Sequence, residues 1–393
     1  MQVLVIGSGG REHTIAWKLS RSPKVSRVCC APGNAGTALL GENVSISGSD
    51  LEGLADYAEN NGIDLTVVGP EAPLVEGIVD LFQSRDLRVV GPSAAAARLE
   101  GSKAFTKQFL KDHQIPSAAF EIFDNPEEAE NCLKKGTFGF PVVVKADGLA
   151  AGKGVLICRD LEESLAAVDL VMQQKKFGSA GDQVVIEEFL QGEEASFMVF
   201  TDGTNILPMV PSQDHKAIYE GDRGPNTGGM GAYSADFLLP DKLRRQILSD
   251  IVEPTVRGMA ERGTPFRGIL YAGLMLTEEG PKVLEYNVRF GDPETQAVLP
   301  RMESDLFELF LALSDGDLSG WSIRWSQNAA VCVVMAAGGY PGSYEKGREI
   351  TGIDMAEEDP DTVVFHAGTA LSDGKIVTSG GRVLGVTSLA PNL

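Results

Sequence analysis

The chain has 393 residues, and its 34 Lys and Arg residues stand against 55 Asp and Glu residues, which gives a formal net charge of −21. This excess of acid argues against a protein that binds nucleic acid or adheres to an anionic membrane surface, because both need basic surfaces. With 43% apolar and 23% charged residues, the composition is that of a globular protein with two or three domains.

The amino-terminal segment enters an apolar run at 3–6 directly, with no basic stretch before it, so no signal peptide is expected. The longest apolar run, at 329–337, has about half the length of a membrane span. The five cysteines are an odd number and none forms a C-x-x-C pair, which argues against a disulfide scaffold or a cysteine metal cluster. We therefore expect a reduced, cytoplasmic protein.

The first hundred residues alternate short apolar runs with amphipathic ones. β-Branched runs typical of fully buried strands occur at 3–6, 27–30, 65–68 and 87–90. The apolar spacing over 51–58 predicts a helix capped by Ser49 or Asp50. This alternation predicts a doubly wound parallel sheet. Every predicted strand ends in glycine or proline, at the sheet edge where open α/β sheets bind ligands.

Beyond residue 100 the pattern changes to α+β. A continuous helix is predicted over 94–111, and a glycine-rich loop without regular structure over 221–231. Further helices are predicted at 161–172 and 241–259. Further strands are predicted at 141–145, 155–158, 183–189, 329–337, 363–366 and 383–386, the first two as a hairpin.

Small residues lie between the first strand and the first helix, from Gly7 to Gly10. They would let backbone N–H groups and the positive helix end approach a phosphate. A dinucleotide fingerprint needs a third glycine where Glu12 stands, and an acid after the next strand, where Ala31 stands. An NAD site is therefore not predicted. The alternatives are a phosphate loop and a tight turn without a ligand.

A second glycine-rich segment follows Lys145. It has three residues between Gly148 and Gly152, and Gly154 rather than Ser or Thr follows Lys153, so it is not a P-loop. We interpret it as a hairpin whose amides and lysines could close over a polyphosphate. The alternative is a hairpin tip with solvated lysines.

The predicted strand at 283–290 carries a row of polar side chains, Glu285, Asn287 and Arg289, on one face. The expected apolar face consists of Leu284, Tyr286, Val288 and Phe290. Glu285 and Asn287 could converge on Mg²⁺ held jointly with phosphates, and Arg289 could bind a carboxylate or phosphate. The alternative is a solvated polar face.

Acidic residues end the predicted strand at 183–189 and continue to Glu194. Beside a nucleotide they would meet the adenine amino group or the ribose hydroxyls, but a solvated acidic loop is the alternative. The sequence has no G-x-S-x-G or H-E-x-x-H motif, and its four histidines are scattered.

Taken in order, these motifs resemble one family, phosphoribosylamine–glycine ligase (glycinamide ribonucleotide synthetase), of the ATP-grasp superfamily. The resemblance covers essentially the whole chain. The segments that carry it are 5–13, 31–37, 68–74, 101–103, 145–154, 212–216, 224–231 and 289–294.

The resemblance implies a multidomain α/β and α+β fold. An α/β domain with the parallel sheet is expected at 1–100, an ATP-grasp domain at 101–320 with a lid subdomain at about 120–190, and a mostly β domain at 321–393. Members of the family continue past the strand near 380–384 with a helix and a further strand. A shortened carboxyl-terminal domain with an uncovered apolar sheet face is therefore expected.

The resemblance also implies an ATP-dependent carboxylate–amine ligase of purine biosynthesis. The carboxylate of glycine attacks the γ-phosphate of ATP to give glycyl phosphate, and the amine of 5-phosphoribosylamine then displaces phosphate. The implied cofactors are ATP and Mg²⁺, with Mn²⁺ as an option. The implied partners are these small molecules, with no nucleic acid or membrane, and a transient contact with the enzyme that supplies phosphoribosylamine is a further option. The alternatives are another ATP-grasp carboxylate–amine ligase and an inactive nucleotide-binding protein.

The resemblance assigns roles to individual residues. The expected ATP-phosphate residues are Lys103 and Lys145, with Gly152, Lys153 and Gly154 in the lid loop. The expected adenine and ribose residues are Glu187, Glu188, Phe189, Leu190 and Glu194. The expected metal ligands are Glu285 and Asn287. The residues expected to position glycine and its acyl phosphate are Asp214, Lys216, Arg289 and Asp292. The residues expected to hold phosphoribosylamine are Gly9, Gly10, Gly33, Asn34, Pro70 and Glu71. Because both phosphate ligands are anionic, we expect a locally positive pocket inside this acidic chain.

Overall fold

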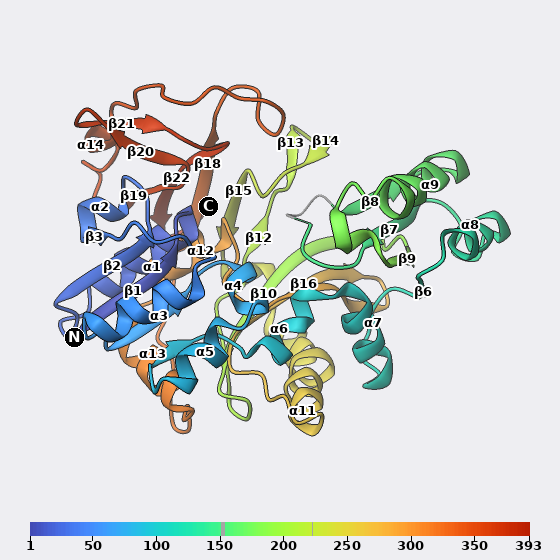
Figure 1. The fold of residues 1–393 in the computed structure, drawn as a ribbon, viewed down its shortest axis with the longest axis horizontal. Helices are drawn as coiled ribbons and strands as arrows, with labels where there is room; N and C mark the ends of the chain where they lie inside the picture. The colour runs from blue at the N-terminus through green and yellow to red at the C-terminus, as the bar shows by residue number, and fades with distance from the viewer. Residues whose placement is uncertain (151–153, 222) are drawn as a thin grey trace.

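The computed structural model describes residues 1–150, 154–221 and 223–393 (Figure 1). A parallel sheet near the amino terminus, two antiparallel sheets in the middle of the chain and a carboxyl-terminal antiparallel sheet form the framework. The expected multidomain α/β and α+β class is confirmed. Among the described residues, no helix is both long and apolar enough to cross a membrane.

The amino-terminal sheet is parallel throughout and has the strand order β3-β2-β1-β4-β5. Its strands are β1 (Gln2–Gly7), β2 (Arg27–Pro32), β3 (Glu42–Asn43), β4 (Leu65–Val68) and β5 (Val89–Val90). The helices around it are α1 (Gly10–Ser20), α2 (Thr37–Leu40), α3 (Leu51–Asn60), α4 (Glu71–Val75) and α5 (Ile78–Ser84). Leu4 and Ile6 pack in the core that holds α3 and α5, and Val3 and Val5 pack in the core that holds α1. This two-sided burial confirms the doubly wound sheet.

Of the two caps predicted for α3, the structure shows Asp50, whose carboxylate accepts a hydrogen bond from Gly53 N at 3.0 Å.

The continuous helix predicted over 94–111 is wrong. Ser102 is extended and separates α6 (Ala94–Gly101) from α7 (Lys103–Asp112). Its hydroxyl accepts a hydrogen bond from Phe105 N at 3.0 Å, so Ser102 caps α7 and places Lys103 in the first turn.

The second sheet is antiparallel and has the order β6-β9-β7-β8. Its strands are β6 (Phe120–Phe123), β7 (Val142–Ala146), β8 (Val155–Cys158) and β9 (Val184–Glu188). The predicted hairpin of β7 and β8 is confirmed, with Lys145 opposite Val155. The helices beside this sheet are α8 (Pro126–Lys135) and α9 (Leu161–Val168), and a π-helical turn at Asp169–Gln173 continues α9. Gly152 and Lys153 lie outside the described residues.

The third sheet has the order β11-β10-β16-β17. Its strands are β10 (Glu193–Thr201), β11 (Ile206–Pro208), β16 (Gly268–Thr277) and β17 (Gly280–Asn287). A bulge breaks the strict alternation predicted for β17, because Gly273 pairs with Glu285 whereas the next residue, Leu274, pairs with Val283. Val283 and Tyr286 therefore share the main core, and Leu284 packs in a separate cluster. The helices α10 (Asp241–Ile247) and α11 (Glu253–Glu261) precede β16 in the chain, and α12 (Glu294–Val298) and α13 (Leu306–Asp315) follow β17.

The carboxyl-terminal sheet has the order β12-β15-β18-β22-β19. Its strands are β12 (Gln213–Asp214), β15 (Gly231–Ser234), β18 (Ala329–Ala336), β19 (Thr362–His366) and β22 (Arg382–Ala390). Two short hairpins and one helical turn accompany it, β13 (Ala217–Tyr219) with β14 (Arg223–Asn226), β20 (Thr369–Ser372) with β21 (Lys375–Thr378), and α14 (Ile353–Ala356). The loop predicted over 221–231 is partly wrong, since it contributes β14 and the start of β15.

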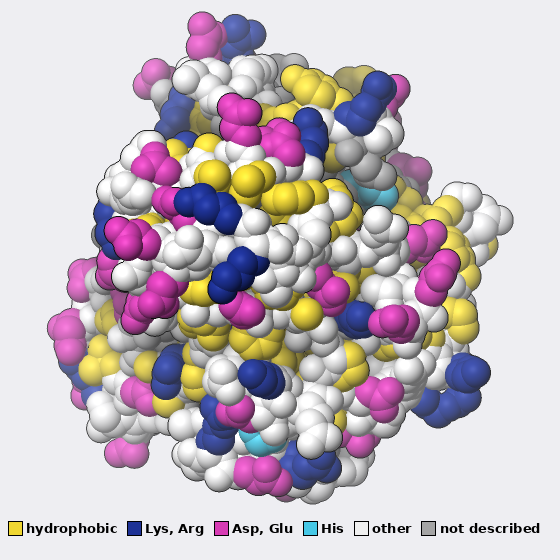
Figure 2. All heavy atoms as spheres, turned by 90° about the vertical axis from the view of Figure 1, so that its right-hand side faces the viewer, with side chains coloured by type: hydrophobic (Ala, Val, Ile, Leu, Met, Phe, Trp, Pro, Cys, Tyr) yellow, Lys and Arg dark blue, Asp and Glu magenta, His cyan; other side chains and the backbone are white. Residues whose placement is uncertain are grey.

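The strand β18 presents apolar side chains on both of its faces. Ala330 and Cys332 are buried, whereas Val331, Val333 and Met335 are 38, 58 and 55% exposed. These three side chains form an exposed apolar strip on the sheet. On the face of the molecule in Figure 2, acidic and basic side chains are interspersed without a continuous basic surface.

Two buried histidines join the beginning and the end of the chain. His13 in α1 and His366 in β19 are 6 and 1% exposed, and His13 Nδ1 accepts a hydrogen bond of 2.7 Å from the backbone N–H of His366. Burial lowers the pKa of His13 to about 3, helped by His366, and burial lowers the pKa of His366 to about 4. Both imidazoles are therefore neutral in the folded protein at neutral pH.

This pair predicts acid sensitivity. Between pH 6.5 and about 4 the unfolded chain binds protons that the folded chain excludes, so the free energy of unfolding falls as the pH falls. From pH 7 to pH 5 each histidine is expected to remove about 2 kcal/mol. Urea unfolding at both pH values measures the loss. In the variant His13→Gln the loss between pH 7 and pH 5 is expected to be smaller by about 2 kcal/mol; an unchanged pH dependence would contradict the assignment.

Candidate active site

The half-buried carboxylate of Glu285 lies among several cationic side chains. Burial alone would raise its pKa, but Lys216, Lys145 and Lys103, together with Arg289, hold the pKa below its ordinary value. Glu285 is therefore ionised, and positive charge surrounds it. The cations come from β7, from the start of α7 and from two loops that lie far apart in the sequence, and the fold gathers them around this carboxylate.

The two lysines expected to meet nucleotide phosphates reach this pocket from different elements. Lys103, at the start of α7, donates through Nζ to the carbonyl oxygen of Gly148 at 2.9 Å, and burial lowers its pKa. Lys145, in β7, donates through Nζ to the carbonyl oxygen of Leu284 at 3.1 Å, directly beside Glu285. The fold thus brings Lys145 onto β17, the strand predicted to carry metal ligands, and brings Lys103 within electrostatic range of Glu285.

The segment expected to bind adenine directs one side chain inward. The carboxylate of Glu187 is 2% exposed and lies 3.0 Å from Lys145 Nζ and 2.8 Å from Lys107 Nζ. Glu188 accepts a hydrogen bond from Ala119 N at 2.9 Å, and Leu190 is buried. The Glu187 carboxylate is therefore occupied by two lysines, and the backbone N–H of Glu188 donates to the carbonyl oxygen of Ala119 at 3.0 Å.

Lys216 joins two of the predicted acids. Its Nζ lies 2.9 Å from Glu194 Oε2 and 3.2 Å from Asp214. Burial alone would lower the pKa of Lys216, but Asp214, Glu194 and Glu285 raise it. Burial and the charge of Glu294 raise the pKa of Asp214 to about 7, against the opposing effect of Lys216. Asp214 is thus poised to exchange a proton near neutral pH.

A hydrogen-bonded group lies behind Asp214. Ser196 Oγ is 2.7 Å from Tyr271 Oη and donates to Glu294 Oε1 at 3.1 Å, and Tyr271 also donates to Glu294. All three side chains are buried. Glu294 is held rigidly and supplies the negative charge that raises the pKa of Asp214.

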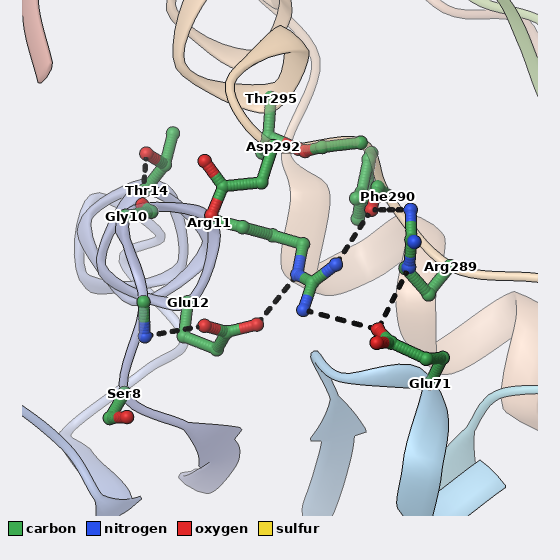
Figure 3. A network of polar contacts seen from close by, with 12 residues as sticks. Ser8, Gly10, Arg11, Glu12, Thr14, Glu71, Arg289, Phe290, Asp292 and Thr295 are labelled. Atoms are coloured by element: carbon green, nitrogen blue, oxygen red, sulfur yellow. Dashed lines mark hydrogen bonds and ion pairs between the residues drawn. The ribbon is translucent and has the colours of Figure 1, made fainter. Parts of the chain in front are cut away.

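Arg289 lies in a network of polar contacts (Figure 3). Its guanidinium donates to Glu100 Oε1 at 2.7 Å and to Asn287 Oδ1 at 2.9 Å, and it forms an ion pair with Glu71 Oε2 at 3.3 Å. Arg11 lies 4.0 Å from the same Glu71 oxygen. Two carboxylates therefore balance the charge of Arg289, which also orients the amide of the predicted metal ligand Asn287.

Glu12 fills the crevice where the order of the parallel strands reverses. Its carboxylate accepts hydrogen bonds from Gly9 N and Arg11 Nε, both at 2.6 Å. A Cβ atom at Gly7 or at Gly69 would overlap the Glu12 side chain. These glycines therefore make room for a protein carboxylate where a dinucleotide-binding fold would receive a phosphate.

A cavity of about 410 Å³ opens beside this loop. Of the six residues expected to hold phosphoribosylamine, Gly9, Gly33 and Asn34 line it. Its lining also includes Ser8, Pro32, Asp292, Tyr340, Ala367, Gly368, Thr369, Ser379, Gly380 and Arg382. The other three expected residues, Gly10, Pro70 and Glu71, are not part of the lining.

Family models match most of the chain. The phosphoribosylglycinamide synthetase N domain matches residues 1–100, the ATP-grasp (A) domain matches residues 101–295, and the C domain matches residues 330–393. The chain belongs to the phosphoribosylglycinamide synthetase family. It is 54% identical to the phosphoribosylamine–glycine ligase of Escherichia coli O6:H1, over 99% of this chain and 91% of that protein. Identity to the ligase of Pseudomonas aeruginosa is also 54%, over 100% of this chain and 91% of that protein.

Solved structures agree with this assignment. Phosphoribosylamine–glycine ligase from Thermotoga maritima superposes with a TM-score of 0.85 at 36% identity, and the match covers all of this chain and 93% of that one. The biotin carboxylase domain of the Hydrogenobacter thermophilus 2-oxoglutarate carboxylase gives a TM-score of 0.73 at 18% identity, covering 100% and 86% of the two chains. The second match shows a shared fold.

In this member of the phosphoribosylglycinamide synthetase family, sequence reasoning missed several residues of the site. Lys107 lies four residues after Lys103 on one helix, and that spacing was the available signal. Glu100 and Arg382 gave no local signal, because each acts across a distance of more than 80 residues, on Arg289 and Asp292.

Proposed function

We propose that this protein joins glycine to 5-phosphoribosylamine with hydrolysis of ATP to ADP and phosphate, giving glycinamide ribonucleotide. The observation that carries the proposal is the group of cations, Lys103, Lys145, Lys216 and Arg289, around the ionised Glu285. A polar cavity lies close by, because its lining includes Asp292, which is three residues after Arg289 in the chain. Relatives that are 54% identical over nearly the whole chain bear the name of this ligase.

The proposed ATP site uses the lysine pair. Lys103 and Lys145 would neutralise the phosphates, and the backbone of 187–190 would bind adenine, with Glu194 at the ribose. Glu285 and Asn287 fit a divalent cation, because Glu285 is ionised and the amide oxygen that Asn287 offers to Arg289 has a second lone pair. We favour Mg²⁺ over Mn²⁺, since hard oxygen ligands shared with phosphates suit it. The ion would supply charge neutralisation at the β- and γ-phosphates.

The proposed reaction has two balanced steps. A carboxylate oxygen of glycine attacks the γ-phosphorus of ATP, the bond to the β-phosphate oxygen breaks, and glycyl phosphate and ADP form. The amine of phosphoribosylamine then attacks the carbonyl carbon, the bond to the phosphate oxygen breaks, and the amine loses a proton. Asp214, whose pKa is raised to about 7, is the group proposed to take up that proton. Lys216 and Arg289 would hold the anionic carboxylate and acyl phosphate in place, and Asp292, whose pKa Arg382 and Arg11 hold below its ordinary value against the effect of burial, would position the ammonium group of glycine.

We place phosphoribosylamine in the cavity of about 410 Å³. The proposed amino-terminal, ATP-grasp and carboxyl-terminal domains, at 1–100, 101–320 and 321–393 with a lid at about 120–190, would each contribute to this region. Gly9, Gly33 and Asn34 would bind the sugar phosphate together with Arg382, the cationic side chain of the described lining. Glu71 would act by holding Arg11 and Arg289.

The variant Arg382→Ala tests whether the cavity binds the sugar phosphate of phosphoribosylamine. Arg382 Nη1 donates to the carbonyl oxygens of Gly228 and Asp292, at 2.6 and 2.7 Å, and faces the proposed sugar phosphate. Its removal is expected to raise the KM for phosphoribosylamine about tenfold or more, with the KM for ATP unchanged. The matched control is Arg348→Ala, since Arg348 is exposed in the same part of the chain. A native KM in Arg382→Ala would place the sugar phosphate elsewhere.

Phosphate release measured with ATP, glycine and phosphoribosylamine, each omitted in turn, tests the overall proposal. Release that requires all three, with glycinamide ribonucleotide as the product, is the expected result. Release that is independent of glycine would point to another carboxylic acid. ATP binding without turnover on any acid would mean that the chain binds nucleotide but is not a ligase.

A further inference from the structure

Lys107 is a buried lysine without a role in the proposed reaction. Its side chain is 4% exposed, and its Nζ is closed off from solvent. Nζ lies 2.8 Å from Glu187 Oε2 and 5.7 Å from the centre of the Phe120 ring. Burial lowers the pKa of Lys107, and the carboxylate of Glu187 opposes that effect. A lysine this deeply buried keeps its charge only through such a partner.

Glu187 is shared between two lysines. While Oε2 faces Lys107, Oε1 lies 3.0 Å from Lys145 Nζ. The exposed fractions of the three side chains are 4% for Lys107, 2% for Glu187 and 8% for Lys145. One negative charge between two positive charges leaves the cluster with a net charge of +1. In a buried cluster this net charge acts strongly on any anion nearby, because little water screens it.

The two lysines differ in what they can reach. Lys145 Nζ also donates to the carbonyl oxygen of Leu284, so its ammonium group borders the pocket around Glu285. Lys107 makes its ion pair behind Glu187, and no acceptor among the described residues meets it with good hydrogen-bond geometry. Lys107 therefore affects Lys145 through its charge, directly and through the carboxylate of Glu187 that the two lysines share.

We propose that Lys107 is a positioning residue that keeps the charge of Lys145 available to the phosphates of ATP. Without Lys107, the carboxylate of Glu187 would form a closed, neutral pair with Lys145, and the net charge of the cluster would fall from +1 to zero. Lys145 would then be drawn toward Glu187 and would attract phosphate less. The inference rests on the proposed use of ATP.

The first experiment compares Lys107→Met with the native protein. Calorimetric titration with ATP, and the KM for ATP in the phosphate-release assay, are both expected to show about tenfold weaker binding, with the KM for glycine unchanged. Lys107→Arg keeps the charge and is expected to stay within about threefold of native affinity. The control is Lys111→Met, an exposed lysine on the same helix, which should bind ATP normally.

The second experiment restores the net charge. The double variant Lys107→Met with Glu187→Gln has a net charge of +1 from Lys145 alone and is expected to bind ATP within about threefold of native affinity. Weaker binding by the double variant than by Lys107→Met would overturn the proposal, as would native ATP affinity in Lys107→Met. If Lys107→Met does not fold, the double variant tests the proposal by itself. In that case, ATP binding by the double variant that is more than tenfold weaker than native would overturn the proposal.

These measurements distinguish a positioning role of Lys107 from partial unfolding of the variant. They also distinguish failure of this inference from failure of the proposed ligase function. A partly unfolded variant loses turnover in proportion to its unfolded fraction and keeps the native KM for ATP, and that result would overturn the positioning role. If the native protein releases no phosphate with glycine and phosphoribosylamine, the ligase proposal fails. Calorimetry with ATP still tests Lys107 in that case.

Discussion

Replacing Glu285 with glutamine is expected to reduce turnover by about a thousandfold or more while the protein stays folded. Glu285 is the ionised carboxylate among Lys103, Lys145, Lys216 and Arg289, and it is one of two proposed ligands for the divalent cation. Its neutralisation adds net positive charge to the pocket. ATP is therefore expected to bind at least as tightly as in the native protein when no metal is present, whereas activation by Mg²⁺ should be lost.

Steady-state phosphate release over a range of Mg²⁺ concentrations measures the first effect, and calorimetry with metal-free ATP measures the second. The matched control is Glu279→Gln, since Glu279 lies in the turn between β16 and β17, is 78% exposed and, among the described residues, forms an ion pair with Lys282 alone. That variant should keep native activity. Near-native turnover of Glu285→Gln with native metal dependence would show that β17 does not hold the metal.

Replacing Arg289 with methionine is expected to destabilise the protein by about 3–5 kcal/mol and to abolish turnover. The change leaves the carboxylates of Glu71 and Glu100 without their main partner, and the Glu100 side chain is only 8% exposed. Burial already raises the pKa of Glu100, and Arg289 is the main opposing influence. In the variant this pKa is therefore expected to rise further.

The sign of the pH effect follows from that shift. A carboxyl group whose pKa is higher in the folded protein than in the unfolded chain binds more protons when folded, so acid stabilises the folded form of the variant relative to the native protein. The deficit in the free energy of unfolding should therefore shrink as the pH falls from 8 to 5, as measured by urea unfolding.

The double variant Arg289→Met with Glu100→Gln should recover part of the stability that Arg289→Met loses. Arg257→Met, at an exposed ion pair, should change stability by less than about 0.5 kcal/mol. A native urea midpoint for Arg289→Met would contradict the assigned role.

Local patterns predicted the elements that depend on near neighbours. Asp50 caps α3 because a carboxylate reaches an amide three residues ahead, and this geometry is contained in the sequence. The break at Ser102 escaped the periodicity argument, because both helices on either side of it have apolar faces. Ser102 donates to Asp147 Oδ1 at 3.0 Å, a contact that depends on the position of a distant turn.

The polar row of β17 was predicted in part. Glu285 and Asn287 do lie near the lysines, as alternation and composition suggested, and Arg289 continues toward Glu100. The bulge opposite Gly273 shifted Leu284 out of the apolar face, because it is set by pairing with β16 rather than by the residues of β17. The inward turn of the Glu187 carboxylate was also missed, since its partner Lys107 is on a different element.

The net charge of −21 was known from the sequence, and so was the identity of the few cations near the predicted motifs. By itself the sequence determined the family and the candidate residues, through the resemblance of its motifs, and most strand and helix types, through composition and spacing along the chain. Only the tertiary structure decided how the charges are paired: Glu12 with Arg11, Arg289 with Glu71 and Glu100, and Glu187 with two lysines. The physical reason is that an electrostatic interaction depends on distance and burial in space. A strongly acidic chain can therefore gather several cations around one carboxylate, an arrangement that no count of its residues reveals.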